Sequence, residues 1–187
     1  MTQLDTMLQR NKKFAAEQKE AGTLIPSLVS ALPNVRAIII TCADPRVDPA
    51  YILGIKPGDA VVIRNIGGRV TPGLLEQLGL LGQIGAATKQ VPGGGGEFHL
   101  IVMHHTDCGM TRLADSPKEL AHYFQISESE VKQKAAGDPR AAIAVDVAAL
   151  RAIPVLPSTW LLSGLVYDVA TGLVDVVVPA APIRKNA

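Results

Sequence analysis

Three short apolar runs, set between segments of helical spacing, constrain the fold of this chain more than any other feature. The runs cover residues 36–42, 60–64 and 98–103. None of them alternates apolar with polar residues, which predicts strands buried on both faces, as in a parallel sheet. Because helical segments separate them, we expect an α/β fold with a mostly parallel central sheet flanked by helices.

Helices are expected on both sides of these runs. Residues 2–21 have the apolar spacing of an amphipathic helix that ends at Gly22. Thr71 and Pro72 are typical of a helix start, with a capping side chain followed by proline in the first turn.

The C-terminal half predicts two further helices and a hairpin. The helices are expected over residues 116–136 and over residues 138–150, and the first contains a capping-box pattern. Residues 160–178 alternate around a turn, which predicts a hairpin that adds an antiparallel edge to the sheet.

Two groups of glycines need a separate explanation. Gly79, Gly82 and Gly85 recur every third residue inside the expected helix. Each costs about 1 kcal/mol relative to alanine, so we expect close backbone approach there, within the chain or at a subunit interface. The four glycines 93–96 are interpreted as a flexible linker.

Size and charge narrow the class of protein. The 187 residues suit one domain, 1–187, with a helical arm over 1–35 and an α/β core over 36–178. The net charge of +1 and the absence of a basic stripe argue against a nucleic-acid binder. Charged residues and prolines interrupt the apolar stretches, and no secretory signal is recognised, so a cytoplasmic protein without a membrane span is expected.

The two cysteines of the chain point to a metal. A structural disulfide between Cys42 and Cys108 would be unusual in a reducing compartment. Together with His105, they follow the ends of two expected parallel strands, where ligands bind in α/β sheets. Thiolate and imidazole donors suit Zn²⁺, and three donors leave a fourth tetrahedral position open.

Asp44 and Arg46 lie beside the first cysteine. Two residues apart in a loop, they are placed to pair, and the arginine would then keep the carboxylate ionised. Such a carboxylate could orient water on the metal or ligate the metal itself.

At this point the sequence resembles the β-class carbonic anhydrases. Residues 42–46 match the motif C-x-D-x-R, and residues 105–109 match H-x-x-C-G. Residues 63–68 and 167–172 resemble family segments in the same order. His104, and Pro33 in place of a substrate-binding glutamine, resemble the short archaeal- or mycobacterial-like branch, which neighbours carbonyl sulfide and carbon disulfide hydrolases.

The resemblance implies a function and an assembly. It implies zinc on Cys42, His105 and Cys108, and attack of zinc-bound hydroxide on CO₂ to give bicarbonate and a proton. An Asp44–Arg46 dyad would orient the hydroxide or gate the fourth zinc position. It also implies a homodimer or homotetramer in which the N-terminal helix packs on a partner subunit.

Simpler interpretations stay open beside these. Cys42 could be a small buried apolar residue, and the Asp44–Arg46 pair a structural salt bridge. His104 is expected to serve packing or a proton relay. Gly67 and Gly68 either satisfy a turn with positive φ or make room beside the zinc, and with Gly109 they are the candidate substrate contacts. Hydrolysis of carbonyl sulfide or carbon disulfide, and a non-catalytic structural zinc module, are the alternative functions.

Overall fold

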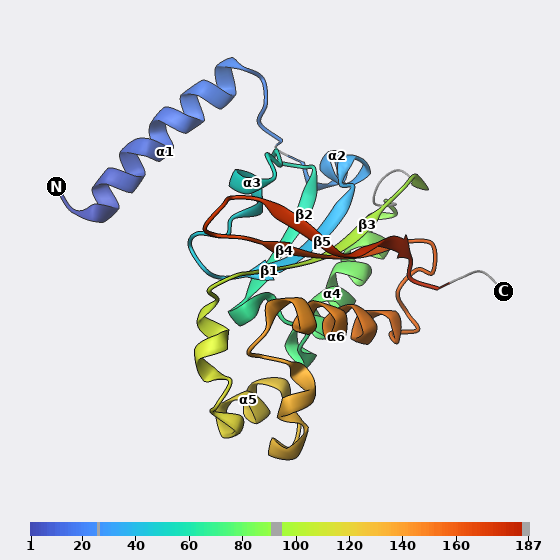
Figure 1. The fold of residues 1–187 in the computed structure, drawn as a ribbon. Helices are drawn as coiled ribbons and strands as arrows, with labels where there is room; N and C mark the ends of the chain where they lie inside the picture. The colour runs from blue at the N-terminus through green and yellow to red at the C-terminus, as the bar shows by residue number, and fades with distance from the viewer. Residues whose placement is uncertain (26, 91–94, 185–187) are drawn as a thin grey trace.

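The computed structural model describes residues 1–25, 27–90 and 95–184 and contains a five-stranded mixed sheet. The strand order is β2-β1-β3-β4-β5 (Figure 1). The strands are β1 (Ala37–Cys42), β2 (Ala60–Asn65), β3 (His99–His105), β4 (Leu161–Tyr167) and β5 (Val174–Pro182). Strands β1 to β4 pair in parallel, and β5 pairs antiparallel with β4. The expected α/β class, parallel sheet and antiparallel C-terminal edge are therefore confirmed.

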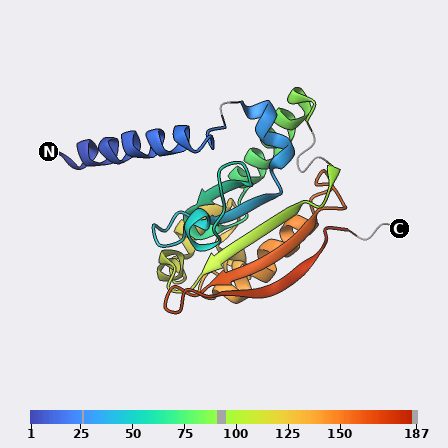
Figure 2. The same cartoon turned by 90° about the horizontal axis from the view of Figure 1, so that it is seen from above.

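Helices α4 (Pro72–Thr88) and α6 (Pro139–Arg151) cover one face of this sheet (Figures 1 and 2). The capping prediction is confirmed, because the Thr71 hydroxyl oxygen accepts a hydrogen bond from the Leu74 N–H at 3.3 Å. Apolar side chains of both helices join those of the strands in the main core, which includes Ile40, Leu74, Val102, Ile143 and Leu162. The core therefore lies between these helices and the centre of the sheet.

A smaller lobe lies beyond the carboxyl ends of β1 and β3. It contains η4 (Gly109–Leu113), α5 (Pro117–Phe124) and η5 (Glu128–Lys134). The continuous helix expected over 116–136 is wrong: α5 ends where Gln125 takes a left-handed conformation with φ 54°, and η5 is a 3-10 helix. The predicted capping box of Ser127 and Glu130 is present, but it starts η5.

The N-terminal helix α1 (Gln3–Glu20) is present as predicted and projects away from the sheet (Figures 1 and 2). None of its residues is buried, although it carries large apolar side chains. A short helix α2 (Leu28–Ala31) and η1 (Leu32–Asn34) then lead into β1. In the part of the chain that the structure describes, no helix is both long and apolar enough to cross a membrane.

Two loop predictions need correction or restriction. The loop expected over 43–50 is shorter, because α3 (Pro49–Ile52) begins within it. The close approach expected within the chain at the helix glycines is wrong. In the described chain, a Cβ on Gly79 or Gly82 would meet nothing within 4 Å, and one on Gly85 would lie 4.0 Å from the Gln90 carbonyl oxygen, an ordinary contact distance. Of the predicted 93–96 linker, residues 93 and 94 lie outside the described residues.

Candidate metal centre

The centre forms where neighbouring strands of the sheet are not consecutive in the chain. Strand β2 pairs with one side of β1, and the chain then returns to place β3 on the other side. Such a change of direction opens a crevice at the carboxyl ends of the strands, where ligands bind in α/β folds. Cys42 is the last residue of β1 and His105 the last of β3, so the topology itself brings them together.

The structure brings the three predicted metal ligands into one buried cluster. The donor atoms of Cys42, His105 and Cys108 all lie within 4.8 Å of one another, and the two sulfur atoms are 3.8 Å apart. All three side chains are buried. Two thiolates and one imidazole at this separation fit a tetrahedral Zn²⁺ with one open position.

The orientation of the His105 ring also fits a metal ligand. Its Nδ1 lies 2.9 Å from the carbonyl oxygen of Thr106, which can only accept, so Nδ1 carries the proton. Nε2 therefore presents its lone pair to the cluster. In the described chain this buried atom has no hydrogen-bond partner, a costly state for a polar atom that a bound metal ion relieves.

The Cys42 sulfur lies in surroundings that favour its thiolate. The neighbouring Cys108 thiol lowers the pKa of Cys42 to about 4, against the opposing effect of burial, and backbone N–H groups of Asp44 and Gly67 assist. The same hydrogen bond raises the pKa of Cys108, because its thiol donates to Cys42, and burial and the negative charge on Cys42 raise it further. A divalent cation resolves this conflict, since a coordinating thiol is deprotonated outright.

Arg46 holds Asp44 beside the cluster. Its Nε and Nη2 donate to the two Asp44 carboxylate oxygens at 3.0 and 2.7 Å, and its backbone N–H donates at 2.9 Å. These hydrogen bonds lower the pKa of Asp44 to about 2. The Oδ2 atom of Asp44 lies 3.9 Å from Nε2 of His105. The predicted pair is thus formed within reach of the donor cluster.

Asp107 fixes the other side of the same arginine. Its Oδ2 accepts from Arg46 Nη1 at 3.0 Å, and its backbone oxygen accepts from Nη2 at 2.9 Å. The exposed Arg112 contacts the second carboxylate oxygen at 3.1 Å. Asp107 has a φ of 51°, a conformation that aspartate tolerates better than most residues. Asp107 lies inside the sequence motif of residues 105–109, but the motif did not predict its contact with Arg46.

The turn after β2 approaches the cluster closely. Gly67 and Gly68 lie in η2 (Ile66–Gly68) with φ of 78° and 68°, so the predicted positive-φ turn is confirmed. A Cβ on Gly68 would lie 2.8 Å from the backbone nitrogen of Cys42, and one on Gly67 would lie 2.9 Å from Met110 Cε. A Cβ on Gly109 would meet nothing within 4 Å, so sterics give no reason for glycine there.

The C-terminal hairpin anchors the metal-binding loop. The Thr106 hydroxyl donates to Asp168 Oδ1 at 3.2 Å and accepts from the Val169 N–H at 3.0 Å. The backbone N–H of Thr106 donates to the Tyr167 carbonyl at 2.9 Å. The segment 167–172, singled out by resemblance, thus has a direct contact with the loop that carries His105 and Cys108.

Sequence reasoning missed a buried ion pair behind the cluster. Arg69 and Asp146 are each 1% exposed, and Arg69 Nε donates to Asp146 Oδ2 at 2.7 Å. His104 is buried beside them. The sequence could have indicated a buried charge, because Asp146 falls on the apolar face of α6, at helical spacing from Ile143 and Leu150.

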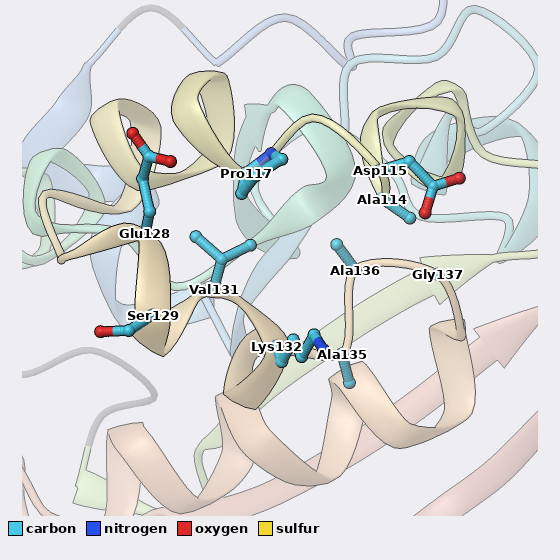
Figure 3. A pocket seen from close by; sticks show the side chains of 10 residues that line it. All are labelled: Ala114, Asp115, Pro117, Glu128, Ser129, Val131, Lys132, Ala135, Ala136 and Gly137. Carbon is cyan, nitrogen blue, oxygen red and sulfur yellow. The ribbon is translucent and has the colours of Figure 1, made fainter.

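A separate pocket lies outside this centre. It has a volume of about 590 Å³, opens between the α5 and η5 segments, and contains none of the three donor residues (Figure 3). Its walls are mostly small or apolar, with Asp115 and Glu128 on opposite sides in Figure 3. We therefore assign the metal chemistry to the buried cluster and not to this pocket.

Comparisons with known proteins agree with this geometry. A model of the carbonic anhydrase family matches residues 37–174. The chain is 32% identical over 183 residues to β-carbonic anhydrase 1 of Mycobacterium tuberculosis, covering 96% of this chain and 100% of that protein. It is 34% identical over 122 residues to carbon disulfide hydrolase of Acidianus, covering 65% of this chain and 49% of that protein. The crystal structure of a carbonic anhydrase from Streptococcus mutans superposes with a TM-score of 0.66 and 30% identity, covering 95% and 98% of the two chains.

Proposed function

Because the chain belongs to the β-class carbonic anhydrase family, a family of zinc enzymes, we propose that it hydrates CO₂ reversibly to bicarbonate and a proton at a zinc ion on Cys42, His105 and Cys108. The observation that carries this proposal is the three-donor cluster, with its donor atoms within 4.8 Å and the His105 Nε2 atom left without a partner in the described chain. Held by these three residues, a zinc ion would lower the pKa of water and so supply a nucleophile near neutral pH.

We propose that Asp44 and Arg46 act on the open position of the metal. The Asp44 carboxylate is ionised at neutral pH and can only accept hydrogen bonds, so it either orients a donor at the open position or takes that position itself. Arg46 keeps the carboxylate in one orientation through two parallel hydrogen bonds. Help from a carboxylate is needed because two thiolates neutralise Zn²⁺ and weaken its effect on water.

Substrate contacts belong to the same proposal. The backbone at Gly67 and Gly68 lies against the donor cluster, so closely that a Cβ on Gly68 would lie 2.8 Å from the Cys42 backbone nitrogen. We expect CO₂ to lie between this turn, Asp44 and the backbone at Gly109. The contact of Gly109 rests on the sequence motif alone.

Carbon disulfide or carbonyl sulfide hydrolysis is the second candidate. It is favoured by the 34% identity to a carbon disulfide hydrolase. Attack of water on the central carbon is chemically parallel for these molecules and for CO₂. Rates measured for each on the same preparation therefore separate the candidates.

We also propose that the chain works as a homo-oligomer, in which residues 1–35 act as an arm on the core over 36–178. Helix α1 leaves large apolar side chains exposed, at 63% for Leu4 and 48% for Phe14. Burial of such an amphipathic face against another copy would stabilise the assembly. Both cysteine ligands must stay reduced to bind zinc, in keeping with the expected cytoplasmic location.

Replacement of Arg46 tests the dyad. In Arg46→Ala the Asp44 carboxylate loses its bidentate partner, so we expect kcat/KM for CO₂ hydration to fall by about 10- to 100-fold, as when partners of metal ligands are removed. Zinc content, measured by atomic emission, should stay at one ion per chain. Stopped-flow assays with a pH indicator give the rates.

Arg112→Ala is the matched control, because Arg112 contacts Asp107 but not Asp44. This variant should keep wild-type rates. If Arg46→Ala also kept them, Asp44 and Arg46 would be only a structural salt bridge.

A further inference from the structure

A second set of charged side chains is buried directly behind the metal centre. Asp146 of α6 accepts from Arg69 Nε at 2.7 Å and from Arg69 Nη2 at 3.3 Å. Its Oδ2 also lies 3.2 Å from His104 Nε2 and accepts from the Val70 N–H at 3.3 Å. Asp146 is thus one carboxylate that holds three groups from two other segments.

One of these segments continues into a metal ligand, and the other follows a turn that contacts one. His104 precedes His105 on β3, and its two ring nitrogens also lie 3.2 Å from the Gly68 carbonyl and 3.3 Å from the Pro139 carbonyl. Arg69 follows the glycine turn whose backbone hydrogen bonds to the Cys42 sulfur. A cavity of about 10 Å³ is lined by side chains of both groups, including Arg69, His104, His105 and Cys108. Residues of the network and of the donor cluster therefore border the same cavity.

Stability alone does not explain a buried network of this kind. Apolar residues of similar volume can replace a buried ion pair with little loss, or with a gain, of stability, whereas removal of one partner is strongly destabilising. In the described chain Arg69 Nη1 is buried without a hydrogen-bond partner, so the network is not even fully satisfied. Unlike apolar groups, these charged groups form directional hydrogen bonds, which fix how the bonded segments are oriented.

We propose that Asp146 is a positioning residue for the metal centre, which holds the turn at Gly67 and Gly68 and the end of β3 against α6. The donors on Cys42 and His105 are then already aligned when zinc binds. This inference rests on the zinc site and not on the reaction proposed above, so it survives if the chain proves to act on another substrate.

Two variants separate positioning from stability. Asp146→Asn leaves the buried Arg69 uncompensated and tests the whole network. The double variant Arg69→Met/Asp146→Leu removes both charges, so it should unfold at a temperature near that of the wild type when saturated with zinc. Leu150→Ala is the control, since Leu150 is a fully buried residue of the same helix in the main core and outside the network.

The measurements are the zinc dissociation constant, from competition with a chromophoric chelator, and the visible absorption of the Co²⁺-substituted protein. We expect both network variants to raise the dissociation constant by about 10- to 100-fold and to alter the Co²⁺ spectrum. Leu150→Ala should unfold at a lower temperature with both readouts unchanged. Wild-type zinc affinity and spectrum in the double variant would overturn the proposal, even if Asp146→Asn failed to fold.

Discussion

At the scale of single residues, the carboxyl end of the sheet combines groups whose neighbours fix their protonation. Asp44 is held ionised by Arg46, and Cys42 is pushed towards its thiolate by Cys108. Tyr123 is the opposite case. Its hydroxyl donates to the Ile66 carbonyl at 2.8 Å, next to the glycine turn, and burial raises the pKa of this phenol to about 12.

This pKa predicts a loss of stability at high pH. An unfolded tyrosine ionises near pH 10, whereas the folded one keeps its proton to about pH 12, so the unfolded state binds fewer protons in this interval and stability falls as pH rises. Tyr123→Phe should remove this part of the pH dependence. Denaturant unfolding from pH 9 to pH 11 checks it, and equal slopes in the two proteins would contradict it.

The metal ligands could be predicted residue by residue because their types are rare in the chain and their chemistry is specific. Only two cysteines are present, and each follows an apolar run. Arg69 and Asp146 could not be found in this way, because their pairing depends on how α6 crosses the sheet. The contact of Arg46 with Asp107 likewise depends on a loop conformation with positive φ that no residue pattern announced.

At the scale of elements, the apolar runs predicted where the strands lie, and β1 and β3 are largely buried as expected. Burial on both faces is wrong for residues 60–64, because β2 is an edge strand in which Val62 is 38% exposed. Residues 36–42 were expected and Ala37–Cys42 is observed. Residues 116–136 were predicted less well, since helical spacing continues across Gln125 although the backbone there turns left-handed. The pattern records which side chains are apolar, but not where tertiary packing ends a helix.

The packing of α6 on β4 depends on one glycine, and we expect Gly164→Ala to destabilise the protein. A Cβ there would lie 2.3 Å from Ile143 Cγ2 and 3.1 Å from Val147 Cγ2. Overpacking of this kind typically costs 1–3 kcal/mol, roughly, in free energy of unfolding. Denaturant unfolding measures it.

Two further variants make this prediction specific. In an Ile143→Ala background the same change should cost less, because the clashing methyl group is gone. Gly79→Ala should instead stabilise by about 0.5–1 kcal/mol, since its Cβ meets nothing within 4 Å in the described chain. A neutral Gly164→Ala would show that α6 and β4 are not in tight contact.

At the scale of the whole molecule, the exposed apolar face of α1 predicts self-association. The full-length variant Leu4→Ser/Leu8→Ser/Phe14→Ser should have a lower mass by light scattering than the wild type, because it lacks the apolar area that another copy would bury. Lys12→Ser/Glu20→Ser changes the polar face and should not alter the mass. A wild-type protein that is already monomeric would contradict the proposed arm.

The central claim also concerns the whole molecule: we propose that this fold serves a zinc-dependent hydration of CO₂. Stopped-flow hydration by protein of measured zinc content, at about pH 7 and about pH 8.5, tests it most directly, with carbonyl sulfide and carbon disulfide assayed in parallel. The account predicts fast CO₂ turnover at one zinc per chain, higher at the alkaline pH, and loss of turnover when a chelator removes the metal. Full zinc occupancy without CO₂ turnover at either pH would contradict it, and would leave sulfide-releasing hydrolysis or a structural zinc site as the function of the cluster.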